Sequence, residues 1–167
     1  MKRREFLEVA TVAAGGCALP APSFGGGRQV KRVSLELYSV RAEMRKDPEG
    51  TLAAVRAMGY DDVELLWSFG NFGRTNEQVK TALANTGLKA PSAHISPLVL
   101  TQDWQKSLDA AAYLGQEYLI APSLTAEAEK SIDEWKRWAE IFNTAGTAAR
   151  KSGIWLGFHN EPNHQKP

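Results

Sequence analysis

The sequence predicts an α/β fold with a parallel β-sheet, and three observations lead to this prediction. Short runs of β-forming residues alternate with segments of helical periodicity from residue 33 onward. A glycine ends each helical segment, and these glycines recur at about the length of one strand and helix. The first run is followed by Arg41 and Ala42 rather than by a glycine-rich phosphate loop. This mildly favours an eight-stranded barrel over a doubly wound nucleotide-binding sheet.

Five strands are expected in chain order. Their candidates are residues 33–40, 62–67, 90–95, 118–121 and 154–158. Because each is separated from the next by a helical segment, the strands should run parallel with helices crossing between them.

Four helices are expected between these strands, and each has a start and an end signal. The start signals are Asp47 before Pro48, Thr75 with Gln78 three residues later, Thr101, and Ser131 with Glu134 three residues later. The end signals are Gly59, Gly87, Gly115 and Gly153. Hydrophobic residues at helical spacing predict the buried stripes, which are Trp104, Leu108 and Ala111 in the third helix and Ile132, Trp135, Ala139 and Phe142 in the fourth.

Residues 1–21 resemble a twin-arginine signal peptide. Arg3 and Arg4 precede a small apolar stretch that glycines interrupt, so it is too short to cross a bilayer. We expect cleavage near Ala21, a flexible linker over residues 22–32, a barrel domain over residues 33–167, and an exported, periplasmic location. The setting of Cys17, the sole cysteine, does not favour lipid attachment, and one cysteine allows no internal disulfide.

The charge of the chain argues against a nucleic-acid partner. The formal net charge is +1 with 20 basic and 19 acidic residues, and cleavage near Ala21 would leave equal numbers. Proteins that bind a phosphate backbone usually carry a basic excess.

Candidate functional residues gather at the carboxyl ends of the predicted strands, where parallel α/β folds place their sites. In chain order they are Glu36, Tyr38, Glu64, Trp67, His94, His159, Asn160 and Glu161. Histidines at the ends of two strands in one parallel sheet are expected to line a common site. Taken singly, each histidine is more simply explained as a hydrogen-bonded structural residue, and it is their convergence that favours a site.

Glu36 and Glu64 lie within strands among apolar neighbours, so each could project toward a barrel interior. A carboxylate there needs a cation, a metal or a hydrogen-bonding sugar. A structural pair with Arg41 or a lysine is the alternative.

Several segments, in order, resemble one known family. They are LELYSVR (35–41), TLAAVRAMGYDDVEL (51–65), TGLKAPSAHIS (86–96), LDAAAYLGQEYLIAPS (108–123) and ARKSGIWLGFHNE (149–161). Together they look like the exported branch of the sugar phosphate isomerase/epimerase proteins, which have a xylose isomerase-like TIM barrel.

The resemblance implies a metal-assisted isomerase or epimerase that moves a proton between neighbouring carbons of a sugar or polyol. It implies catalytic roles for Glu64, His94 and His159, and divalent-metal ligation (Mn, Zn or Mg) by His159 and Glu161. Glu36, Tyr38, Trp67 and Asn160 are then expected to bind substrate. The sequence departs from the family at Glu161, where a second histidine is expected, and at Glu36, which replaces a glutamine.

The last residues match the end of a fifth strand, so we expect the chain to be the amino-terminal part of a longer eight-stranded barrel. Unpaired sheet edges would then be exposed, and a homo-oligomer is one way to cover them. Two other functions stay open. The altered HNEPNH segment (159–164) favours a non-catalytic carbohydrate-binding or interaction protein. A metal-dependent nuclease shares this barrel, but the neutral charge and the export signal count against it.

Overall fold

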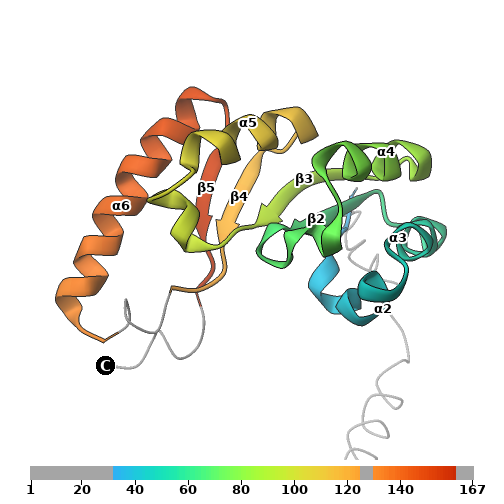
Figure 1. The fold of residues 1–167 in the computed structure, drawn as a ribbon, viewed down its shortest axis with the longest axis horizontal. Coiled ribbons are helices and arrows are strands. Elements are labelled where there is room, and N and C mark those ends of the chain that lie inside the picture. The colour runs from blue at the N-terminus through green and yellow to red at the C-terminus, as the bar shows by residue number, and fades with distance from the viewer. Residues whose placement is uncertain (1–31, 125–129, 161–167) are drawn as a thin grey trace, which may run out of the picture. The chain divides into compact units, whose positions relative to one another are not determined.

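A computed structural model describes residues 32–124 and 130–160. Its centre is a parallel five-stranded sheet in the order β1-β2-β3-β4-β5 (Figure 1). The strands are β1 (Ser34–Glu36), β2 (Asp62–Leu66), β3 (Lys89–His94), β4 (Tyr118–Ala121) and β5 (Trp155–Phe158). The predicted parallel α/β sheet is confirmed, and its architecture is that of part of a TIM barrel.

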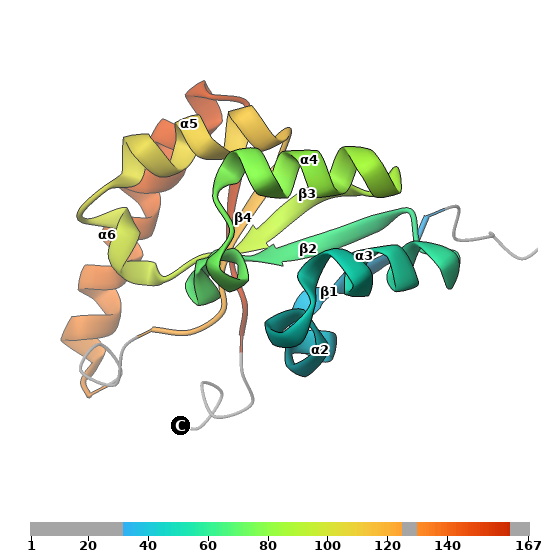
Figure 2. The same cartoon turned by 45° about the vertical axis from the view of Figure 1, so that its right-hand side comes forward.

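Helices connect the strands and cover one face of the sheet (Figures 1 and 2). The α-helices are α2 (Arg41–Lys46), α3 (Pro48–Ala57), α4 (Asn76–Thr86), α5 (Trp104–Leu114) and α6 (Ile132–Lys151). Short 3-10 helices follow the first three strands, namely η1 (Leu37–Val40), η2 (Trp67–Gly73) and η3 (Pro97–Leu100).

Three of the four predicted helix starts are confirmed. The Asp47 side chain accepts a hydrogen bond from the Gly50 backbone at the start of α3, and Thr75 forms a full capping box with Gln78. The Ser131 side chain accepts from the Glu134 backbone at the start of α6. All four predicted end glycines adopt positive φ, where a side chain would be strained.

Some predicted boundaries were wrong. The first strand ends at Glu36 instead of residue 40, because the chain turns there into η1 and then α2, a helix that the sequence analysis missed. Thr101 does not start α5; it ends η3, and Asp103 precedes the helix. A short turn of 3-10 helix carries too few residues for hydrophobic periodicity to reveal it.

The predicted stripe of α5 is confirmed, whereas that of α6 is confirmed at Trp135 and Phe142 and wrong at Ile132 and Ala139. Ile132 is 68% exposed, and Ala139 is also exposed. The buried residues of α6 are Trp138, Ala145 and Ala149, with Trp135 and Phe142 at the border of the core. Because the helix has a tryptophan at both 135 and 138, the sequence offered two neighbouring hydrophobic surfaces of α6 as the buried one.

The two faces of the sheet differ in character. Side chains alternate between the faces of a strand, and the helix-covered face buries Val63, Leu65, Ala93, Leu119 and Ala121. The opposite face carries Glu36, Glu64, Ser92 and His94 on neighbouring strands. Hydrophobic burial on one face therefore orients the polar residues on the other.

The register of β2 and β3 shifts by one residue before the site. Asp62 pairs with Lys89, but Glu64 pairs with Ser92, so β3 uses one residue more than β2 in a stretch that contains Pro91. Irregular pairing of this kind often lies beside functional sites and changes the direction of side chains. Here it brings Ser92 opposite Glu64.

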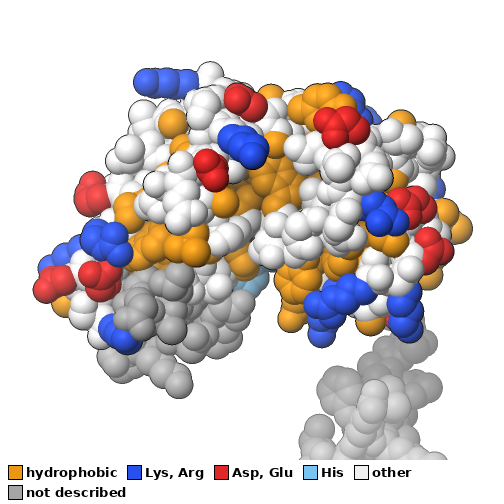
Figure 3. All heavy atoms as spheres, viewed as in Figure 1, with side chains coloured by type: hydrophobic (Ala, Val, Ile, Leu, Met, Phe, Trp, Pro, Cys, Tyr) orange, Lys and Arg blue, Asp and Glu red, His pale blue; other side chains and the backbone are white. Residues whose placement is uncertain are grey.

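The predicted signal peptide, most of the linker and Cys17 lie outside the described residues, as does Glu161. The described part of the chain contains no helix that is long and apolar enough to cross a bilayer. On the face shown in Figure 3, acidic and basic side chains are interspersed.

Candidate active site

A cleft of about 320 Å³ opens at the carboxyl ends of the strands. Its lining comes from β1, β2, β3 and the segments after β1, β2, β4 and β5. The lining residues are Glu36, Tyr38, Leu66, Ser68, Phe69, His94, Pro122, Ser123 and His159. Four of the eight predicted site residues, Glu36, Tyr38, His94 and His159, are therefore brought together in one cleft.

His94 lies between two carboxylates. Its Nδ1 is 3.1 Å from Glu36 Oε1, and its Nε2 is 3.1 Å from Glu64 Oε1. The His94 and Glu64 side chains are 10% and 15% exposed, whereas that of Glu36 is 37% exposed. The predicted alternative of a structural pair between these glutamates and Arg41 is not what the structure has, since Arg41 instead donates to the Tyr38 carbonyl.

Glu64 is held from a second side. Ser92 Oγ donates a hydrogen bond of 2.5 Å to Glu64 Oε2. The backbone oxygen of Ser92 in turn accepts from the side chain of Gln116, which is buried at 5% exposure. Both oxygens of Glu64 therefore have neighbours, and its orientation is fixed.

An aromatic pair forms another wall of the cleft. The rings of Tyr38 and Phe69 meet edge to face at 5.8 Å between centroids. Phe69 is carried by η2, in which Asn71 and Phe72 adopt positive φ of 47° and 57°. This conformation is strained for residues with side chains, and partial burial of Phe72 against the core stabilises it.

The other predicted residues are placed differently. The ring of His159 meets that of His94 edge to face, at 5.9 Å between centroids, and Asn160 follows it at the surface. Trp67 packs against the core and is not a lining residue of the cleft; its indole nitrogen is buried and has no hydrogen-bond partner among the described residues.

Glu36, Glu64 and His94 also form a candidate metal site. One ligand atom from each lies within 4.8 Å of the others. This set differs from the predicted pair His159 and Glu161, of which Glu161 is not described. Carboxylate oxygens with one imidazole nitrogen suit Mn²⁺, Zn²⁺ or Mg²⁺.

The distances fit such an ion. Each ring nitrogen of His94 lies 3.1 Å from a carboxylate oxygen, so an ion bound to one of these nitrogens would be within reach of the carboxylate that faces it.

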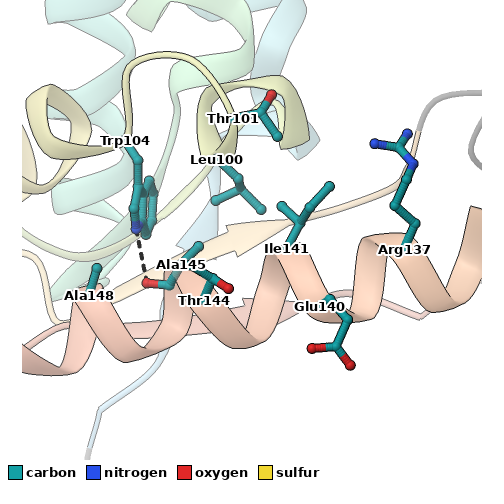
Figure 4. A pocket seen from close by; sticks show the side chains of 9 residues that line it. All are labelled: Leu100, Thr101, Trp104, Arg137, Glu140, Ile141, Thr144, Ala145 and Ala148. Atoms are coloured by element: carbon teal, nitrogen blue, oxygen red, sulfur yellow. Dashed lines mark hydrogen bonds between the residues drawn. The ribbon is translucent and has the colours of Figure 1, made fainter.

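A larger cavity, of about 410 Å³, lies between η3, α5 and α6 (Figure 4). Two of its lining residues are hydrogen-bonded, since Trp104 Nε1 donates to the Ala145 carbonyl at 2.9 Å. Of its two charged lining residues, Arg137 pairs with Glu134 on the same helix, and Glu140 is exposed. It holds no pair of converging titratable groups, so the smaller cleft is the candidate active site.

The sequence analysis missed Ser92 and Phe69 as site residues. Ser92 could have been found, because it lies two residues before His94 on the same strand and so shares its face. Phe69 had no such signal, since η2 is irregular and its direction depends on packing.

A family model described as the xylose isomerase-like TIM barrel matches residues 52–167. The chain belongs to this family. The predicted resemblance to it is thereby confirmed, and the match spans the segments that carry His94 and His159. No curated protein matches the chain in sequence.

Solved structures agree with this assignment. A sugar phosphate isomerase/epimerase from Parabacteroides distasonis is 28% identical with a TM-score of 0.70, and the match covers 89% of this chain and 58% of that one. The chain described here therefore spans less than two thirds of the length of this relative.

More distant structures establish the same fold. The IOLI protein with a binding zinc atom is 11% identical with a TM-score of 0.59, covering 76% of this chain and 50% of that one. L-ribulose 3-epimerase is 16% identical with a TM-score of 0.53, covering 76% of this chain and 48% of that one.

Proposed function

We propose that this family member is a sugar isomerase or epimerase that moves a proton between neighbouring carbons of a sugar or polyol. The observation that carries the proposal is that His94 lies between Glu36 and Glu64 and lines the cleft together with Glu36. A proton bound to a carbon beside a carbonyl needs a base at hydrogen-bonding distance and a group that stabilises the negative charge that develops.

Different residues of the cleft can transfer the proton and bind the substrate. Glu36 and His94 line it together and offer a carboxylate and an imidazole for accepting and returning a proton. The Tyr38 and Phe69 rings provide an apolar surface for the face of a sugar ring. Ser123 and His159 supply polar atoms across the cleft that can bind hydroxyl groups.

A divalent ion is part of the proposal. The three residues that would hold it are Glu36, Glu64 and His94. When bound, such an ion polarises the substrate carbonyl and stabilises an enediolate. The zinc in the IOLI structure supports metal binding by this fold, although at low sequence identity.

Proton exchange with heavy water tests the proposal directly. The purified chain is incubated in D₂O with a panel of ketoses, aldoses and their phosphates, with Mn²⁺, Mg²⁺ or Zn²⁺ added in turn. We expect deuterium at the carbon next to the carbonyl of at least one substrate, measured by NMR. Glu36→Gln should remove it, whereas Glu140→Gln, the same change on the exposed side of α6, should not.

The panel also separates the two functions that the sequence left open. Calorimetric binding of a sugar without any deuterium incorporation would contradict catalysis and support a carbohydrate-binding protein. Absence of both binding and exchange across the panel would contradict the proposed function altogether.

A further inference from the structure

We propose that Arg41 and Arg45 of α2 are positioning residues that hold the rings of Tyr38 and Phe69 in place as the aromatic wall of the cleft. The contacts themselves do not depend on the proposed function, but their effect on substrate affinity rests on it. Neither arginine lines the cleft, so each acts through the ring that it covers.

The helix α2 places both arginines beside the wall. It directly follows η1, which carries Tyr38, at the carboxyl end of β1 (Figure 2). Residues three and four positions apart share one side of a helix, so Arg41, Met44 and Arg45 lie together. Met44 is buried at 3% exposure and anchors this side of α2 to the core. The two guanidinium groups are therefore held at the edge of the core, where the aromatic rings lie.

Each guanidinium group lies over one ring. Arg41 Cζ is 4.1 Å from the centre of the Tyr38 ring, and Arg45 Cζ is 5.3 Å from that of Phe69. Both distances are within the range of about 6 Å over which a cation is attracted to the face of a ring. Arg41 Nη1 also donates to the Tyr38 carbonyl at 2.8 Å, so Arg41 contacts the ring and the backbone of the same residue.

No carboxylate competes with the rings for these two cations. In the described part of the chain neither Arg41 nor Arg45 forms an ion pair, whereas four other arginines do: Arg32, Arg56, Arg74 and Arg137. The aromatic rings are thus the partners that fix the two guanidinium groups, and the attraction is mutual.

The wall depends on such contacts because it is only partly buried. Tyr38 is 44% exposed and Phe69 is 37% exposed, and the two rings come from different segments, η1 and η2. Their edge-to-face contact joins the segments at one point. An exposed ring that is already fixed before a ligand binds loses less entropy on binding, and the affinity is correspondingly higher.

The chain contains a matched pair outside the cleft. Lys80 Nζ lies 4.0 Å from the centre of the Tyr113 ring and donates to the Tyr113 carbonyl at 3.0 Å. Tyr113 is 44% exposed, as Tyr38 is, but this pair joins α4 to α5. Lys80→Gln is therefore the control for Arg41→Gln. The pair also shows that a lysine can make both contacts, so Arg41→Lys should retain the function of Arg41.

Fluorine NMR of the protein labelled with 3-fluorotyrosine tests the contact without substrate or metal. The chain has four tyrosines, and Tyr38→Phe assigns the signal of Tyr38. In Arg41→Gln this signal should sharpen and move toward its position in the unfolded protein, because the ring gains mobility. In Arg41→Lys it should stay close to that of the wild type. Lys80→Gln should change the signal of Tyr113 and leave that of Tyr38. An unchanged Tyr38 signal in folded Arg41→Gln protein would overturn the proposal.

The exchange assay, run with the ketose or aldose that exchanges fastest, measures the effect on the substrate. Loss of one exposed cation–ring contact corresponds to about 2-fold to 5-fold in binding, so Arg41→Gln and Arg45→Gln should each raise KM by that factor. The value of kcat should change little, because in the described structure neither arginine forms a hydrogen bond or ion pair with His94 or Glu36. Arg41→Lys should restore KM, and Lys80→Gln should alter neither constant.

The outcomes separate this inference from the proposed function. If the wild-type protein exchanges no substrate proton, the proposed function fails, and the fluorine signal of Tyr38 still decides whether Arg41 holds the ring. If exchange occurs but KM is the same in Arg41→Gln and Arg45→Gln as in the wild type, only the positioning proposal fails. A fall in kcat with unchanged KM would also contradict it.

Discussion

The two faces of the sheet are built from alternate residues of the same strands, yet they are organised by different forces. On the helix-covered face, Val63 and Leu119 are completely buried in a continuous apolar core. On the cleft face, Glu64 contacts two polar side chains, those of Ser92 and His94. Because side chains alternate between the two faces of a strand, residues that stabilise the fold alternate with residues that form the site. Substitutions one residue apart should therefore have different consequences.

The largest effect on stability is expected on the helix-covered face. Leu119→Ala removes a side chain with 0% exposure from the centre of β4, and such truncations cost about 2–5 kcal/mol of unfolding free energy because a cavity remains. Urea unfolding measures this loss. Leu98→Ala, the same change at a side chain that is 44% exposed, should cost much less; equal losses at both positions would contradict the assigned core.

The cleft face should show the reverse pattern. Glu36→Gln is nearly isosteric at a side chain that is 37% exposed, so the thermal midpoint should stay close to that of the wild type. Deuterium exchange into substrate should fall by about 100-fold or more, as expected for loss of a general base. A variant with full exchange activity would exclude Glu36 from proton transfer.

A smaller effect is expected within the helix layer. Trp104→Phe removes the hydrogen bond from Nε1 to the Ala145 carbonyl, which joins α5 to α6, and one such bond contributes about 1 kcal/mol. Trp67→Phe makes the same change where the buried nitrogen has no partner among the described residues. Chemical denaturation should therefore show a greater loss for Trp104→Phe than for Trp67→Phe, and the reverse order would refute this view of the interface.

The smallest effect is expected at the surface pair of Glu49 and Arg74. Arg74 donates bonds of 2.6 and 2.7 Å to the two oxygens of Glu49, and this hydrogen bonding is the main reason that the pKa of Glu49 is lowered from 4.5 to about 2. A carboxyl group with a lowered pKa stabilises the folded state above its unfolded pKa, and this contribution is lost as the pH falls through the folded value.

The window for this loss therefore lies between pH 4.5 and about 2. Because both side chains are substantially exposed, solvent and salt weaken the pair. Glu49→Gln should flatten the acid side of the stability curve slightly, measured by thermal melts at low salt, whereas Glu140→Gln should leave it unchanged. A curve identical to that of the wild type would show that the pair does not stabilise the fold.

Much of the fold was predictable because its signals are local. The capping box of Thr75 and Gln78 and the positive φ of Gly87 act within one turn of helix, and the structure has both. Similarly, β4 was predicted at its observed bounds because a short apolar run with Tyr118 and Ile120 lies between Gly115 and Pro122. The error at α6 arose because hydrophobic spacing alone could not choose between Trp135 and Trp138 as the centre of the buried stripe.

The sequence by itself determined the strand and helix order, the capping residues and the presence of glutamate and histidine at strand ends, since these depend on neighbours within a few positions. Only the tertiary structure decided that Ser92 meets Glu64, a contact between residues 28 positions apart. That contact requires the register shift between β2 and β3. It also requires a core that fixes which face each strand presents, because the direction of a side chain across a sheet is set by packing between strands and not by the local chain.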